Sequence, residues 1–196
     1  MNDLKRTYRI FLAGALVLGC AGSTSSQSID PSKPQAKVIV QRTKDHGVSI
    51  TTIKLDPILI QSNEVTKAYI LLSALVAYGD KSPRRKSVSL SFHSRSPSCR
   101  FSNKSNLLLI LDDETITLTS NAQKYGDGGL WVFSEPEGDL CNESCSVFIS
   151  EQTFLRIIRS KNVEARLGAV TLRLGEIHLK ALRDLAAYIA NAKGAV

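Results

Sequence analysis

Alternating apolar and polar residues are the most regular feature of the chain after residue 37. The clearest case is the segment 88–93, in which Val88, Leu90 and Phe92 alternate with two serines and a histidine. Because successive side chains of an extended strand point to opposite faces, this order places the three large apolar residues on one face. We therefore predict an antiparallel strand that is buried on one side and half-exposed on the other.

The residues before this strand predict a hairpin and a third strand. Segments rich in β-branched residues at 38–40 and 48–55 flank a short polar stretch suited to a turn. Proline has no backbone N–H and is disfavoured inside a sheet, so Pro57 is expected to break the second strand and leave a short strand at 58–60. The largely apolar segment 65–78 fits a strand or a helix, and we predict a strand because a strand follows it.

Four shorter strands are predicted farther along the chain. The sequence Asp112-Asp113-Glu114 favours a hairpin turn between the first two, because aspartate bonds readily to its own backbone. An acidic loop at 135–144 is expected between the other two, and Trp131, the one tryptophan, is expected to pack in the core. The four strands are 107–111, 115–119, 130–134 and 145–149.

The last third of the chain adds helices. Ser150 is suited to cap a helix that begins at the next residue, and the segment 176–192 has leucines at helical spacing. Between them, 163–175 predicts a hairpin in which Glu164 faces Arg173. The fold class expected is therefore α+β: a predominantly antiparallel β-sheet or sandwich with one short helix and a C-terminal amphipathic helix packed on the sheet.

The N-terminal residues have the features of an export signal. Basic residues precede an apolar segment at 10–18, which is too short to span a bilayer comfortably, and 17–20 read Val-Leu-Gly-Cys. This sequence resembles the lipobox of bacterial lipoproteins, and the resemblance implies that Cys20 is acylated and becomes the new N-terminus. The alternatives are an ordinary signal peptide cut near Ala21 or an uncleaved anchor. Each of these routes exports the chain.

The rest of the chain is expected to form a tether and one domain. We predict a signal peptide at 1–19, a flexible Ser-, Gln- and Pro-rich tether at 20–37, and a single β-rich globular domain at 38–196. Residues 154–185 resemble the ends of many exported bacterial proteins of unassigned function, which implies a compact envelope domain but no chemistry. The lipoprotein resemblance implies a periplasmic location, anchored to the outer membrane.

The chain is mildly basic. Its formal net charge is +7, of which residues 1–19 carry +2, so the rest keeps +5. Such a balance favours anionic surfaces, which in a cell envelope are lipid head groups, phosphorylated glycolipids and acidic wall polymers. Nucleic acid is not expected as a partner, and a short charge run is also typical of a solvated loop. The candidate binding residues are Lys81, Arg84, Arg85 and Lys86, with Arg95, Arg100 and Lys104 as possible additions.

Once Cys20 carries lipid, three cysteines remain. Cys141 and Cys145 would form a short staple if a turn brought their Cα atoms within about 7 Å. Cys99 paired with either one would close a loop of roughly 40 residues and stabilise the fold more. We favour Cys141 with Cys145, and pairing of Cys99 and the absence of any bond are the alternatives. A metal site would need further ligands, so no metal and no other cofactor is predicted.

No motif for catalysis stands out. The chain lacks a Gly-x-Ser-x-Gly turn, and His46, His93 and His178 fall in unlike settings. Acidic residues at 135–143 offer oxygens to calcium but do not have the spacing of an EF-hand loop. The glycine-rich segment 125–129 lacks the strand-to-helix context of a phosphate-binding loop and is better interpreted as a mobile loop.

The function expected from these observations is that of a non-enzymatic, lipid-anchored envelope protein. It would contact the membrane through its N-terminal lipid and bind an envelope protein or an anionic envelope component. The alternative is a hydrolase or transferase that acts on cell-wall or glycolipid substrates, which would require a pocket that gathers ionisable residues such as His93 and Asp112.

Overall fold

The structure is a computed structural model that describes residues 37–45, 48–79, 87–101, 106–119 and 128–193. The described residues belong to one compact unit. Within them, neither helix is long and apolar enough to cross a membrane. The predicted signal, the predicted tether up to residue 36 and the basic loop at 81–86 lie outside the described residues.

Six strands form the larger of two antiparallel sheets, in the order β1-β2-β3-β4-β8-β7. The first four strands are neighbours both in sequence and in the sheet, and β8 pairs with β4 so that β7 lies at the edge. The strands are β1 (Val38–Asp45), β2 (Val48–Asn63), β3 (Ala68–Gly79), β4 (Ser87–Ser96), β7 (Gly128–Glu137) and β8 (Leu140–Ser150).

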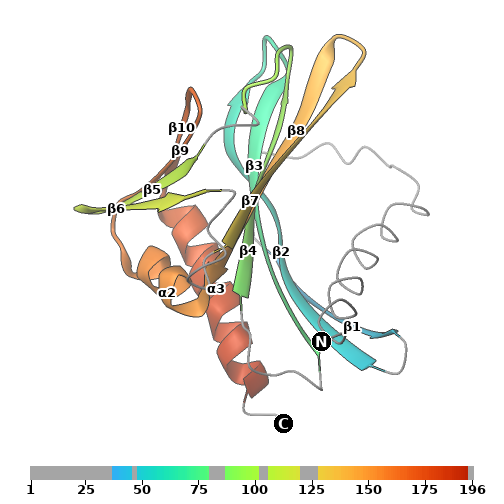
Figure 1. The fold of residues 1–196 in the computed structure, drawn as a ribbon, viewed down its shortest axis with the longest axis vertical. Helices are drawn as coiled ribbons and strands as arrows, with labels where there is room; N and C mark the ends of the chain where they lie inside the picture. The colour runs from blue at the N-terminus through green and yellow to red at the C-terminus, as the bar shows by residue number, and fades with distance from the viewer. Residues whose placement is uncertain (1–36, 46–47, 80–86, 102–105, 120–127, 194–196) are drawn as a thin grey trace, which may run out of the picture. The chain divides into compact units, whose positions relative to one another are not determined.

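A smaller sheet and two helices cover one face of the larger sheet (Figure 1). The smaller sheet has the order β10-β9-β5-β6, and all its pairings are antiparallel. Its strands are β5 (Leu107–Leu111), β6 (Glu114–Leu118), β9 (Val163–Leu167) and β10 (Val170–Leu174). The helices are α2 (Glu151–Arg159) and α3 (Glu176–Lys193).

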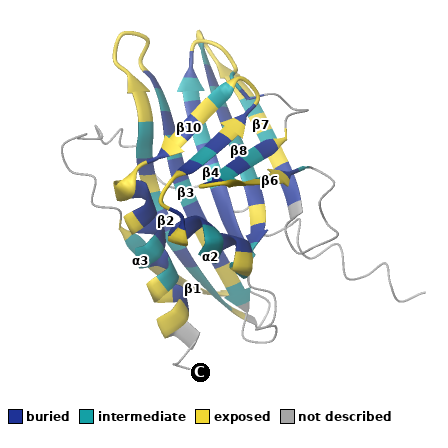
Figure 2. Cartoon of the chain, turned by 90° about the vertical axis from the view of Figure 1, so that its left-hand side faces the viewer, coloured by how far each residue is buried: buried dark blue, intermediate teal, exposed yellow. Residues whose placement is uncertain are grey.

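The core lies between the larger sheet and the elements that cover it. Figure 2 looks from the covering side and shows buried residues on the strands behind α2 and α3. Val88, Leu90 and Phe92 are at most 2% exposed, as their alternation predicts. From α3, the core receives Leu179, Leu182, Leu185 and Ile189. The α+β class is thus confirmed, with two packed layers around one core.

Two local predictions of the C-terminal third are confirmed in detail. The Ser150 side chain accepts a hydrogen bond from the backbone N–H of Thr153 at 3.1 Å and caps α2. Glu164 lies opposite Arg173 in the β9–β10 register, and Arg173 Nε is 3.3 Å from its carboxylate. Arg166 donates to the same carboxylate at 2.5 Å, so both arginines lower the pKa of Glu164.

Two predicted breaks in the strands are wrong. Pro57 does not end a strand, because β2 continues through it and shifts register against β3 between Leu55 and Ile58. A bulge leaves residues unpaired and so tolerates the missing N–H of proline. The acidic loop at 135–144 does not exist either: β7 and β8 continue through it and leave only a two-residue turn at Gly138 and Asp139.

Candidate functional site

The face of the larger sheet opposite the core carries the most varied chemistry among the described residues. We call it the outer face, and no described element covers it. The register of β3, β4, β8 and β7 aligns its side chains in rows. In that strand order, the rows are Leu75, Ser89 and Phe148; Ser73, Ser91, Ser146 and Trp131; Leu71, His93, Ser144 and Phe133; and Tyr69, Arg95, Asn142 and Glu135.

Four large apolar side chains on this face are exposed. The exposed fractions are 37% for Leu75, 54% for Trp131, 61% for Phe133 and 38% for Phe148. The expectation that Trp131 packs in the core is therefore wrong. Alternation along β7 turns Leu130 and Val132 inward, which leaves Trp131 and Phe133 on the outer face.

Trp131 is held in a defined position. Its ring meets the ring of Phe148 edge to face, with 5.1 Å between the ring centroids. Gly129 lies beneath it with φ +61°, and a Cβ built there would lie 2.8 Å from the tryptophan Cζ3 atom. A glycine at this position therefore allows both the backbone conformation and the place of the ring.

Hydroxyl groups and an imidazole fill the space between the apolar side chains. The Oγ of Ser73 lies 3.1 Å from Nε2 of His93, and the hydroxyls of Ser91 and Ser146 are 2.8 Å apart. Burial lowers the pKa of His93 below its ordinary value. The imidazole is therefore mostly uncharged at neutral pH, and its tautomer decides whether Nε2 accepts the hydrogen bond from Ser73 or donates it.

A hollow of about 250 Å³ opens on this face over the last two rows. Phe133 lines one flank and Tyr69 the other, with His93, Arg95 and Asn142 between them. The volume lies below the range of drug-sized ligand pockets, which begins at roughly 300 Å³. It suits one small ring or head group.

One end of the hollow is polar and carries opposite charges. Arg95 Nη2 is 3.4 Å from Glu137, and the Asn142 amide donates to the same carboxylate at 2.6 Å. Glu137 is 61% exposed, so the ion pair is open to solvent and is worth about 0–1 kcal/mol. The Nε of Arg95 is buried and has no hydrogen-bond partner within the described ranges. A ligand cannot reach that buried atom, but the Arg95 side chain is 38% exposed, so its Nη groups can donate to a ligand.

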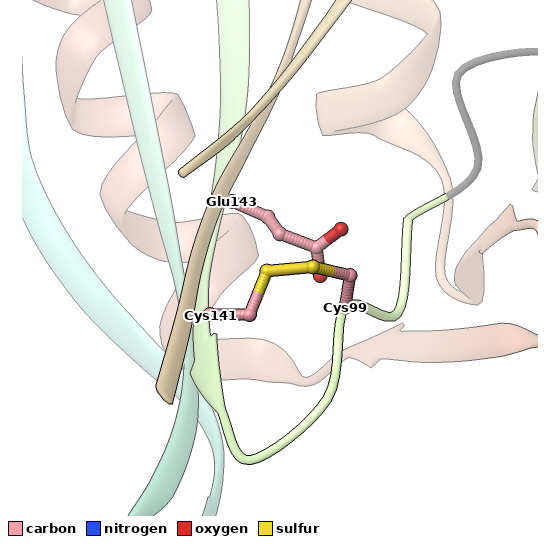
Figure 3. A group of neighbouring side chains, drawn as sticks. All are labelled: Cys99, Cys141 and Glu143. Atoms are coloured by element: carbon pink, nitrogen blue, oxygen red, sulfur yellow. A yellow bond between two sulfur atoms is a disulfide. The ribbon is translucent and has the colours of Figure 1, made fainter. Parts of the chain in front are cut away.

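On the core side of the same strands, a disulfide joins Cys99 to Cys141 with 5.4 Å between the Cα atoms (Figure 3). The favoured pairing of Cys141 with Cys145 is wrong, and Cys145 is a buried free thiol. Both residues belong to β8, where four residues span roughly 13 Å, too far for a disulfide.

Glu143 lies beside this disulfide (Figure 3) and is 3% exposed. Its carboxylate accepts hydrogen bonds from the backbone N–H of Arg100, from that of Phe101 at 2.9 Å and from the Ser134 hydroxyl at 3.1 Å. The group resembles a metal site in composition, but its sulfurs are bonded to each other and its carboxylate is engaged by donors. It is therefore a structural clamp on the segment 99–101.

The other candidates from the sequence do not gather into a site. Glu143 faces the core while Glu135 and Glu137 face outward, so these acids do not form a calcium site. Asp112 lies in the turn between β5 and β6 of the smaller sheet, where its carboxylate accepts from the backbone N–H of Asn162 at 2.9 Å.

His178 is 7% exposed; its Nδ1 accepts from the Gly175 N–H at 3.0 Å, and its Nε2 donates to the carbonyl oxygen of Leu59 at 2.9 Å. Its ring is thus engaged within the fold and is not part of the outer face. His46, the basic residues at 81–86, Lys104 and the segment 125–127 lie outside the described residues.

Comparisons with known proteins assign this chain to no family: no family model, no curated protein and no solved structure matches it.

Proposed function

We propose that the protein is a non-enzymatic binding protein of the cell envelope, anchored by lipid on Cys20, and that its outer face holds the ligand. The observation that carries the proposal is the set of four exposed apolar side chains on a single face of the sheet. Exposed apolar groups gathered in one place are typical of interaction sites. The hollow beside them adds the convergent polar groups of a binding site.

The sequence supports a location in the cell envelope. Residues 17–20 resemble a lipobox, and the Ser- and Pro-rich segment after them is suited to a tether. The net charge of +5 that remains without residues 1–19 and Arg95 in the hollow favour an anionic envelope component over a neutral one. The basic residues Lys81, Arg84, Arg85 and Lys86 remain predicted contributors to that preference.

The test is co-sedimentation of the full-length protein with envelope fractions in mild detergent. The double variant Trp131→Ala/Phe133→Ala should lose most of the retention. The matched control is Ile177→Ala/Tyr188→Ala, which removes two apolar side chains of α3 that are 41% and 50% exposed. Equal retention of both double variants would refute the outer face as the binding surface.

The anchor is tested separately. Intact-mass analysis should show an acylated Cys20, and Cys20→Ser should move the protein from the detergent-rich to the aqueous phase of a detergent partition while leaving binding by the outer face intact. An unmodified residue 20 in the mature protein would refute the lipid anchor.

A second candidate function is a hydrolase or transferase, favoured by the 3.1 Å contact between Ser73 and His93. Two features count against it. No carboxylate orients the imidazole among the described residues, and Asp112 lies in the other sheet. Turnover of a chromogenic ester that Ser73→Ala abolishes and Ser91→Ala retains would establish this function instead.

A further inference from the structure

We infer that the ligand of the outer face is a saccharide that carries an acidic group, with one sugar ring seated in the hollow between Tyr69 and Phe133. This inference rests on the proposed binding function and names its ligand class. It is carried by the way in which aromatic rings and hydrogen-bonding groups alternate on the face.

The composition of the face calls for a ligand that is both apolar and rich in hydroxyls. Trp131, Phe133 and Phe148 form an aromatic stripe along β7 and β8, and a track of serines with His93 runs beside it. A sugar ring has the same two properties, because its C–H bonds form apolar patches and its hydroxyls donate and accept around the rim. Each surface on the protein thus has a counterpart on a sugar.

Two other classes of ligand fit the same face less well. A lipid chain would cover the hydroxyls of Ser73, Ser91 and Ser146. Each hydroxyl has one partner in the fold and capacity for more, which a lipid chain could not satisfy, so covering them is unfavourable. An extended peptide gains most of its affinity by pairing with a free strand edge. The hollow lies over β3, β4 and β8, which are paired on both sides, and reaches the edge strand β7 at Phe133. A peptide paired with the free edge of β7 would lie in the plane of the sheet, beside the hollow and not over it.

The dimensions agree with a short glycan. The hollow of about 250 Å³ holds one ring, with a flank on Phe133 and a flank on Tyr69. Phe133 and Trp131 lie two residues apart along β7, which is a distance of roughly 7 Å in an antiparallel strand. Trp131 is therefore placed to meet the next ring of the same chain.

Arg95 is the cation that lines the hollow, and an acidic group on the ligand would be its counterpart. Glu135 and Glu137 face the same side of the sheet but do not line the hollow, and the lining carboxylate of Glu143 is engaged by its own donors. The Arg95 side chain is 38% exposed, and the pair that its Nη2 forms with Glu137 at 3.4 Å is open to solvent. A ligand carboxylate or phosphate can displace that weak pair and accept charge-assisted hydrogen bonds from the guanidinium. The Asn142 amide, which now donates to Glu137, lies beside it and can donate to the same group.

The test uses the full-length protein in mild detergent and the fluorescence of Trp131, the one tryptophan of the chain. Two probes form a matched pair: cellotetraose and its C6-oxidised form, which carries a carboxylate on each ring. The acidic probe should change the fluorescence at lower concentration than the neutral one. Phe133→Ala should weaken it by about tenfold, as expected for loss of one aromatic contact of about 1.4 kcal/mol. Arg95→Gln should remove the preference for the acidic probe.

A second experiment distinguishes failure of the saccharide inference from failure of the proposed binding function. Envelope extract is divided into three portions, of which one is left untreated, one is treated with periodate and one with protease. Periodate cleaves the vicinal diols of sugars, so periodate treatment should abolish the fluorescence response and protease treatment should leave it. Loss after protease with retention after periodate would overturn the saccharide and leave the binding function standing. No response to any extract or probe would refute both, and a response that follows self-association on light scattering would assign the face to a second copy.

Discussion

Breaking the disulfide between Cys99 and Cys141 should lower the free energy of unfolding by about 4 kcal/mol. The bond closes a loop with a sequence separation of 42 residues. In the chain-entropy account, a cross-link over that length removes about 13 cal/mol/K of entropy from the unfolded chain, which is about 4 kcal/mol at room temperature. The double variant Cys99→Ala/Cys141→Ala isolates this contribution.

The assay is urea denaturation of the variant and the parent protein under oxidising conditions. With a slope near 2 kcal/mol per molar urea, the midpoint should fall by about 2 M. Cys145→Ala is the control, because it removes a buried sulfur and keeps the bond, and its cost should stay near 1 kcal/mol.

A tryptic digest without reductant checks that Cys99 is bonded to β8, and the same digest of the Cys145→Ala control assigns the bond to Cys141. Cleavage after lysine and arginine separates residues 96–100, which contain Cys99, from residues 125–156, which contain the other two cysteines. The two peptides should remain linked and should separate on reduction. A free 96–100 peptide, or a midpoint that the double variant does not change, would refute the reasoning.

Three further predictions concern single side chains. Glu143→Ala should lower the free energy of unfolding by about 3 kcal/mol in a urea titration, because it leaves three donors without their acceptor. Glu135→Ala, on the exposed side of the same hairpin, should lower it by less than about 0.5 kcal/mol, and equal losses of stability would contradict the clamp. Gly129→Ala should expel the tryptophan ring and shift its emission, while Gly138→Ala, with the same positive φ and open space, should leave the emission unchanged. Burial holds the pKa of His93 below its ordinary 6.5, so the unfolded chain takes up the proton first, and stability falls as the pH drops from about 7 through the folded pKa. His93→Gln should flatten the dependence of the urea midpoint on pH between pH 7 and pH 5. Superimposable plots of midpoint against pH for the variant and the parent protein would rule this out.

Local patterns predict much of this fold because each depends on a few neighbouring residues. The alternation at Val88, Leu90 and Phe92, the Ser150 cap and the Glu164–Arg173 pair are all decided within one strand, turn or hairpin. The apolar segment that forms β3 fits a helix or a strand by itself, and the alternating strand that follows it is what favours a strand.

The failures involve partners that the chain meets only after folding. The proline of β2 is tolerated because the register with β3 shifts there, and the cysteine partner is fixed by where 99–101 returns to β8. In the candidate site, alternation predicts that His93 lies on the polar face of its strand. The row that joins His93 to Phe133 crosses three strands, and their pairing cannot be predicted from one strand alone. Alternation in 130–134 places Trp131 on the outer face, but this signal conflicts with the usual preference of tryptophan for cores.

The free thiol of Cys145 affects how the native bond survives. In an unfolded, oxidising setting, Cys141 is nearest in sequence to Cys145, so the wrong ring closes most readily and has to be exchanged. Exchange needs a thiolate, and burial in β8 raises the pKa of Cys145 to about 12. Formation of β8 therefore stops thiol–disulfide exchange within the molecule, so completion of the sheet also fixes the covalent connectivity.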